Sequence, residues 1–149
     1  MNVQQLNKEQ VVLAALASAA GEVFTPVQIQ KLLFLLERRL WPNHELGPYF
    51  NFAAYDYGPF DADVYVVLEN LQKKGLVEIF NEPHLRWNKY KSTTKGAAEG
   101  KAVLQSLGED VRNYLQALSE FVRGLSFAEL VGAIYKAYPE MKVNSVFRG

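Results

Sequence analysis

The sequence contains no cysteine and only two histidines among its 149 residues. Without cysteine there can be no disulfide bond, thiolate nucleophile or cysteine-ligated zinc, and a reducing compartment is compatible. His44 and His84 lie forty residues apart, a separation that fits no metal-binding motif. A glycine-rich phosphate loop and a serine in a nucleophile elbow are also absent. We therefore expect no enzymatic activity, no cofactor and no metal site.

The chain also lacks net charge and a long apolar run. Sixteen basic and sixteen acidic residues cancel, which removes the overall-charge argument for a nucleic-acid or anionic-membrane partner. The longest apolar run, residues 32–36, is far too short to cross a bilayer. No basic region followed by an apolar core and a cleavage site opens the sequence. These absences predict a cytoplasmic protein without a membrane partner.

Helical periodicity dominates what is present. The spacing of apolar residues predicts helices over residues 8–20, 26–40, 61–74, 95–107, 109–123 and 126–138. Alanines make the first of these slim enough to approach a neighbour closely. Phe34 and Leu35 lie outside the apolar stripe of the second, which predicts burial on more than one side. Pro42 is expected to prevent that helix from continuing.

Several helix starts carry capping signals. Thr25 with Gln28 and Ser126 with Glu129 have the spacing of capping boxes. Thr94 is expected to cap the helix that follows it.

Two strand-like runs, residues 76–80 and 85–92, predict a β-hairpin with a four-residue loop. Residues 50–55 are aromatic and apolar and are expected to form a short strand or extended segment. Helix, helix, helix and hairpin over residues 8–92 is the order of a winged helix-turn-helix. The predicted fold is mainly α, a winged-helix-like core with a small β-hairpin plus additional packed C-terminal helices over residues 93–140. We expect one domain over residues 1–149.

The most distinctive stretch is residues 55–60, which leads into the third helix. Gly58 before Pro59 is expected to turn the chain. Asp61 is a good helix cap, and the dipole favours Asp63 in the first turn. The aromatic residues of the stretch either join the two halves of the core or form a partner-binding patch, and for Tyr57 both alternatives stay open.

A basic region surrounds the hairpin. Between residues 73 and 101, seven basic against three acidic side chains leave a local excess of four. The candidate basic wing consists of Arg86, Trp87, Lys89 and Lys91. It could contact nucleic acid, dock an acidic protein or be a solvated face. A helix over residues 61–74 would bring carboxylates to DNA phosphates, so this pattern favours a protein partner over specific DNA recognition.

Four short motifs together resemble the SocA-like antitoxin family, also called the Panacea domain, over about residues 8–139. They are residues 31–35, Tyr57-Gly58-Pro59, the helix with Tyr65 and Leu68, and Thr94-Lys95-Gly96, with residues 134–139 as a similar close. The resemblance implies a protein that binds and neutralises a cognate toxin encoded beside it. In some members of the family the antitoxin delivers the toxin to a protease.

The expected partner-binding residues are Tyr57, Asp61, Asp63 and Tyr65. They would form an exposed edge for the toxin protein. The tail from Met141 onward is expected to be loosely held, and residues 143–149 are one conceivable handle for a protease. The alternative function is a winged-helix DNA-binding transcriptional regulator that uses the basic wing.

Overall fold

The computed structural model describes residues 6–44, 49–81, 83–84 and 86–147, with only the backbone described for residues 41–44. Its α-helices are α1 (Lys8–Ala17), α2 (Pro26–His44), α3 (Asp63–Lys73), α4 (Thr94–Ser106), α5 (Glu109–Gly124) and α6 (Phe127–Ala137), followed by a short 3-10 helix η1 (Pro139–Lys142). The strands form two antiparallel hairpins, β1 (Ala53–Tyr55) with β2 (Gly58–Phe60) and β3 (Val77–Phe80) with β4 (Lys89–Ser92). The predicted mainly α fold with a small hairpin is confirmed.

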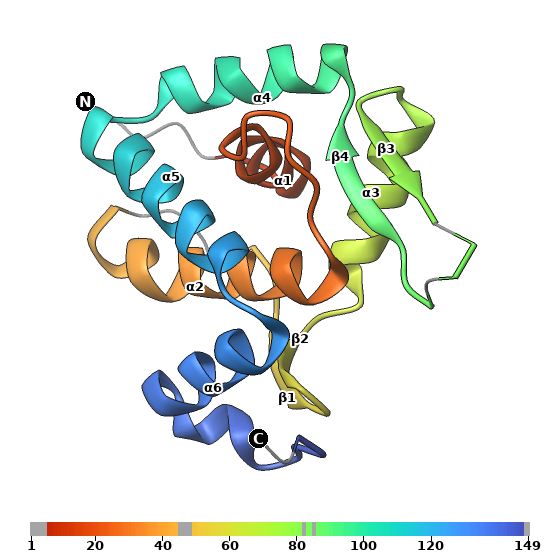
Figure 1. Cartoon of the computed structure of the whole chain (residues 1–149). Coiled ribbons are helices and arrows are strands. Elements are labelled where there is room, and N and C mark those ends of the chain that lie inside the picture. The colour runs from red at the N-terminus through yellow and green to blue at the C-terminus, as the bar shows by residue number, and fades with distance from the viewer. Residues whose placement is uncertain (1–5, 45–48, 82, 85, 148–149) are drawn as a thin grey trace.

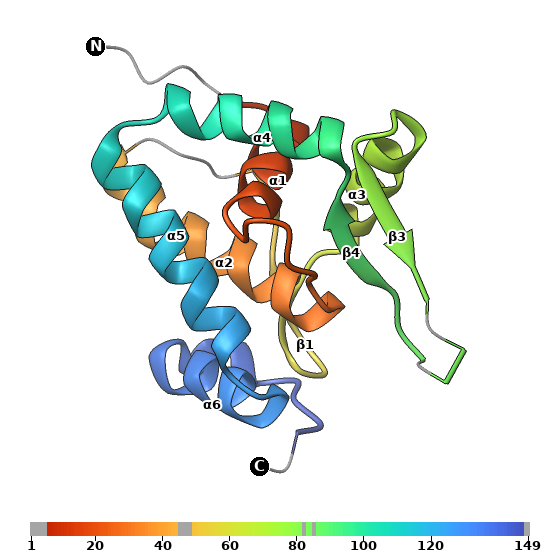
Figure 2. The same ribbon diagram turned by 45° about the horizontal axis from the view of Figure 1, so that its top comes forward.

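The helix α1 lies at the centre, with α2, α3 and α4 packed around it (Figures 1 and 2). Every residue from Val11 to Leu16 is buried, so this stretch of the helix has no solvated face. A methyl group added at Gly100 of α4 would lie 2.4 Å from the carbonyl oxygen of Leu13. The slim first helix predicted from its alanines is therefore confirmed by a close approach of two helix backbones.

The N-terminal helices and the C-terminal helices share one hydrophobic core. A single cluster of buried side chains includes Leu16, Leu33, Leu115 and Ile134, which belong to α1, α2, α5 and α6. The predicted burial of α2 on several sides is also confirmed, because Phe34 is 1% and Leu35 4% exposed. Helix α2 thus packs between the N-terminal helix α1 and the C-terminal helices α5 and α6.

Three local predictions were wrong. Helix α2 continues through Pro42 to His44, because a proline in the last turn removes only one hydrogen bond there. The cap of α4 is Thr93, whose hydroxyl accepts a hydrogen bond from the backbone N–H of Gly96 at 3.0 Å. Strand β3 ends at Phe80 and β4 begins at Lys89, so the connection between them is longer than four residues.

The expectation of a loosely held tail was also wrong. Asn144 Nδ2 donates to the carbonyl oxygen of Ala54 at 3.1 Å. The backbone N–H of Val146 donates to the carbonyl oxygen of Asp56 at 2.9 Å. The ring of Phe147 packs against Phe127, with centroids 6.0 Å apart. Residues 144–147 are therefore fixed to the β1–β2 hairpin and to the start of α6.

Candidate functional site

The β1–β2 hairpin presents Tyr57 in a tight turn. Strand residues Tyr55 and Gly58 are paired, which leaves Asp56 and Tyr57 as the two turn residues. Gly58 has a φ of +103°, a conformation that side chains disfavour. A methyl group added here would lie 3.4 Å from the ring of Tyr135, which is an ordinary contact, so the backbone conformation and not space accounts for the glycine.

Two consecutive polar residues of α2 hold the backbone that follows the turn. The buried Gln30 side chain donates to the carbonyl oxygen of Asp61 at 2.9 Å and accepts from its N–H at 3.1 Å. Lys31 Nζ donates to the carbonyl oxygen of Pro59 at 3.1 Å. Because the backbone is fixed at both positions, the hairpin is rigidly placed against α2.

A groove of about 570 Å³ lies between this turn, the start of α2, the loop of the β3–β4 hairpin and the α5–α6 junction. Its lining residues are Thr25, Pro26, Val27, Gln28, Tyr57, Trp87, Leu125, Ser126, Phe127 and Leu130. We call it the aromatic groove, because Tyr57, Trp87 and Phe127 are 42%, 47% and 45% exposed. Large exposed aromatic side chains gathered on one surface typically mark a binding site.

Both predicted capping boxes are confirmed, and both lie at this groove. Gln28 N donates to Thr25 Oγ1 at 3.2 Å, and Thr25 N donates to the Gln28 side chain at 2.9 Å. The corresponding distances between Ser126 and Glu129 are 3.1 and 2.9 Å. Two capped helix N-termini therefore meet at one apolar surface.

A smaller pocket of about 190 Å³ adjoins the aromatic groove and shares Pro26, Val27 and Tyr57 with it. Its remaining lining residues are Gln30, Lys31, Tyr55, Asp56, Gly58, Phe60 and Tyr65. We call it the Lys31 pocket. Burial lowers the pKa of Lys31 to about 8, and burial raises the pKa of Tyr65 to about 12.

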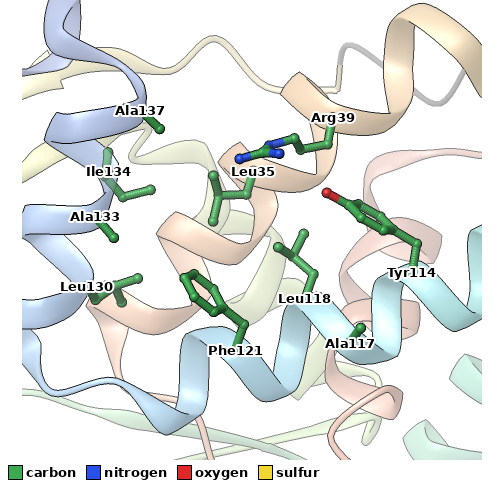
Figure 3. Close-up of a pocket in the computed structure, with 10 residues that line it drawn as sticks. All are labelled: Leu35, Arg39, Tyr114, Ala117, Leu118, Phe121, Leu130, Ala133, Ile134 and Ala137. Carbon is green, nitrogen blue, oxygen red and sulfur yellow. The ribbon is translucent and has the colours of Figure 1, made fainter.

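A third cavity of about 290 Å³ lies between α2, α5 and α6 (Figure 3). Figure 3 shows the side chains of Arg39 and Tyr114 at one end and those of Phe121 and Ile134 further along. Phe121 is 50% exposed. This cavity has fewer exposed aromatic residues than the aromatic groove.

The structure separates the four predicted partner-binding residues into two groups. Tyr57 lines both the aromatic groove and the Lys31 pocket, and Tyr65 lines the Lys31 pocket alone. Asp61 accepts hydrogen bonds from the N–H groups of Asn51 and Asp63 at 2.7 and 2.9 Å. The N-cap position of α3 is Ala62, so the prediction of Asp61 as the cap was wrong by one residue, although its side chain binds the first helical N–H. Asp63 pairs with Lys8. Neither carboxylate lines a cavity described above.

The residues of the candidate basic wing also divide into those that line the aromatic groove and those that do not. Trp87 lines the aromatic groove, whereas Arg86, Lys89 and Lys91 do not. Arg86 and Lys91 are exposed, and Lys89 is half-buried. Tyr55, expected to join the two halves, is 54% exposed and stacks on Phe60 with ring centroids 5.0 Å apart.

Sequence reasoning missed Phe127 and Lys31 as site residues. Phe127 sits beside a recognised capping box, and its ring contacts Tyr57 with centroids 5.2 Å apart. The signal for Lys31 was available, because a lysine within a helix predicted to be buried on several sides must itself be partly buried. No signal in the sequence places Phe127 beside a turn seventy residues earlier.

No protein-family model matches the chain, and no curated protein matches it either. Within the described residues, no cluster of three or more histidine, aspartate or glutamate side chains is placed to hold a metal ion. Nor does any helix in this part of the chain have the length and apolar character needed to cross a membrane.

Proposed function

We propose that the chain is an antitoxin-like protein-binding domain that neutralises a cognate toxin by direct binding in the cytoplasm, without catalysis. The observation that carries the proposal is the aromatic groove. Its three exposed aromatic side chains come from three separate segments of the chain, namely the β1–β2 turn, the β3–β4 loop and α6. The resemblance to SocA-like antitoxins supplies the kind of partner.

The groove has the composition of a protein interface. Aromatic residues dominate binding energy at such surfaces because they bury large areas at a small cost in side-chain entropy. Around Tyr57 the backbone is already fixed by Gln30 and Lys31, so little further ordering is needed when a partner binds. A segment of the toxin that lays apolar side chains against the exposed rings of Tyr57, Trp87 and Phe127 fits this surface.

Co-expression with the product of the adjacent gene tests the proposal. We expect that product to arrest growth when expressed alone, and to co-purify with this chain when both are expressed. An adjacent product that is harmless alone and does not co-purify contradicts the proposal. If delivery to a protease contributes, the toxin should also have a shorter half-life in the presence of this chain.

The second candidate, a DNA-binding regulator, is favoured by one observation. Arg86 and Lys91 of the basic wing are both exposed, and exposed cations on a hairpin can contact phosphates. Against it, Asp63 and Glu69 lie on α3, where they would repel the DNA backbone if this helix entered a groove. A mobility-shift assay with the upstream DNA over a series of salt concentrations tests this candidate.

A further inference from the structure

Lys31 is a buried cation without an acidic partner in the described part of the chain. The residue is only 3% exposed. Its ammonium carries three donors, of which one is used by the carbonyl oxygen of Pro59 at 3.1 Å. The ion pairs that the structure describes join other residues. A buried charge normally lies beside an opposite charge, because its desolvation costs several kcal/mol.

The pocket beside Lys31 has the size of a side-chain group. Its volume is about 190 Å³, whereas small-molecule sites typically range from about 300 to 1,000 Å³. Aromatic rings of Tyr55, Phe60 and Tyr65 form much of its wall. A short chain of methylene groups that ends in a carboxylate would fill this volume, with the methylenes against the rings.

We infer that the Lys31 pocket binds a carboxylate, which in a complex is supplied by an acidic side chain of the partner protein. Charge-assisted hydrogen bonds from the ammonium to carboxylate oxygens are about twice as strong as neutral ones. The pocket adjoins the aromatic groove, so a partner segment in the groove can place one acidic residue beside Lys31. The claim that a partner protein supplies the carboxylate rests on the proposed function. The claim that the Lys31 pocket binds a carboxylate does not.

Asp56 provides an internal check on this inference. It is the acidic residue that lines the pocket, and no ion pair joins it to Lys31 in the described residues. Its carboxylate therefore repels an incoming anion across the pocket. Replacement by the neutral isostere, Asp56→Asn, should tighten carboxylate binding about threefold at low salt, and the gain should shrink as salt screens the charge.

The experiment follows the lysine signals of the full chain by NMR with 13C-labelled lysine, while sodium acetate is added at constant ionic strength against sodium chloride. We expect a saturable shift of the Lys31 ε-carbon signal and an increase in its pKa, because a bound carboxylate stabilises the charged form. Lys31→Met identifies the signal, with Lys31→Arg as a second variant if the first does not fold. Lys91, which is exposed, is the control.

A Lys31 signal that responds to acetate no more than to chloride, or no more than the Lys91 signal does, overturns the inference. A purely structural lysine would show that result, because its only role would be to hold the carbonyl oxygen of Pro59. Acetylglutamate N-methylamide and its glutamine counterpart show whether the carboxylate can be that of a protein side chain. We expect the glutamate compound to shift the signal and the glutamine compound to leave it unchanged. If acetate binds and the glutamate compound does not, a partner side chain is not the source of the carboxylate.

Failure of the proposed function gives a different pattern. An adjacent gene product that neither arrests growth nor co-purifies would leave the response to acetate unchanged. Conversely, a partner that binds normally while Lys31 ignores acetate would retain the proposed function and remove the anion site.

Discussion

The β1–β2 hairpin and the β3–β4 hairpin each contribute one aromatic side chain to the aromatic groove, but they are held in different ways. The β1–β2 hairpin has a two-residue turn and is fixed along its length by α2 and by the C-terminal tail. The β3–β4 hairpin has a longer connection between Phe80 and Lys89. Its strand β4 is held beside that connection, where Phe24 and Tyr90 exchange two backbone hydrogen bonds of 2.9 Å each.

This difference separates the two aromatic contributions in physical terms. Tyr57 projects from a backbone that is already ordered, so its contact with a partner costs little additional entropy. Trp87 lies in the longer connection, where Asn81 Nδ2 donates to its carbonyl oxygen at 3.0 Å. A longer connection has more freedom to lose when a partner binds. We therefore expect Tyr57 to form the fixed wall of the groove and Trp87 the more adaptable wall, and the following variants test that contrast.

The largest effect is expected where the base of the β3–β4 hairpin meets α4. A methyl group at Gly96 would lie 1.7 Å from the carbonyl oxygen of Leu76, a contact that the two backbones can relieve only by moving apart. We expect Gly96→Ala to lower the free energy of unfolding by about 3–5 kcal/mol, measured by urea denaturation.

Gly132→Ala is the matched control. Gly132 lies in α6 with no heavy atom within 4 Å of the position of an added methyl group. We expect this variant to be more stable by about 0.5–1 kcal/mol, as for an exposed helix position. Equal stabilities of the two variants would show that α4 does not fix the hairpin base.

The next effect concerns the anchor of the β1–β2 hairpin. Burial lowers the pKa of Lys31 from 10.5 to about 8, so between these values the unfolded chain binds more protons than the folded chain. Stability should therefore rise with pH across this window, by roughly 3 kcal/mol in total. Lys31→Met should abolish the rise, and subtraction of the two pH profiles removes the contribution of the tyrosines. If stability still rises with pH in the Lys31→Met variant, the rise does not come from a buried charged lysine.

The two aromatic walls are compared directly through partner affinity. We expect Tyr57→Ala to weaken binding of the partner by about 2 kcal/mol, roughly thirtyfold, as for a central interface aromatic residue. Trp87→Ala should cost less, because part of its contact energy is spent on ordering the loop. Isothermal titration calorimetry measures both, and circular dichroism checks that both variants fold. A larger loss for Trp87→Ala reverses the assignment of the fixed and adaptable walls.

The smallest effect is expected for the cations of the β3–β4 hairpin. Charge reversal by Lys89→Glu and Lys91→Glu should change partner affinity by less than about 0.5 kcal/mol, since these residues do not line the groove. The same double variant should abolish binding to upstream DNA if the basic wing contacts phosphates. If DNA binding is insensitive to this charge reversal, the basic wing does not contact DNA phosphates.

Local signals in the sequence predicted much of the fold. The capping boxes at Thr25 and Ser126 fixed two helix starts because their hydrogen bonds involve residues only three positions apart. Alanine content predicted the close packing of α1, and the apolar stripes predicted the buried faces. The boundary near Pro42 was wrong because a single missing hydrogen bond at a helix end is too small an effect to stop the helix.

The candidate site was only partly predictable, because it is made by contacts between distant segments. Tyr57 was singled out from its turn, and Trp87 was assigned to the wing, but nothing local shows that the two share a groove with Phe127. Asp61 was predicted both as a cap and as a partner contact, but α3 begins at Asp63 with Ala62 at the N-cap position, and the Asp61 side chain accepts from the N–H of Asp63. The pairing of Asp63 with Lys8 joins residues 55 positions apart and has no sequence signature.

Site-specific photocrosslinking at two aromatic positions of similar exposure locates the partner-binding surface. Phe127 is 45% exposed at the aromatic groove, and Phe121 is 50% exposed at the cavity between α5 and α6. Each is replaced by p-benzoylphenylalanine, and the chain is co-expressed with the adjacent gene product. The account predicts a crosslinked complex from position 127 and none from position 121. A crosslink from position 121 alone, or from neither position while the two proteins co-purify, would contradict it.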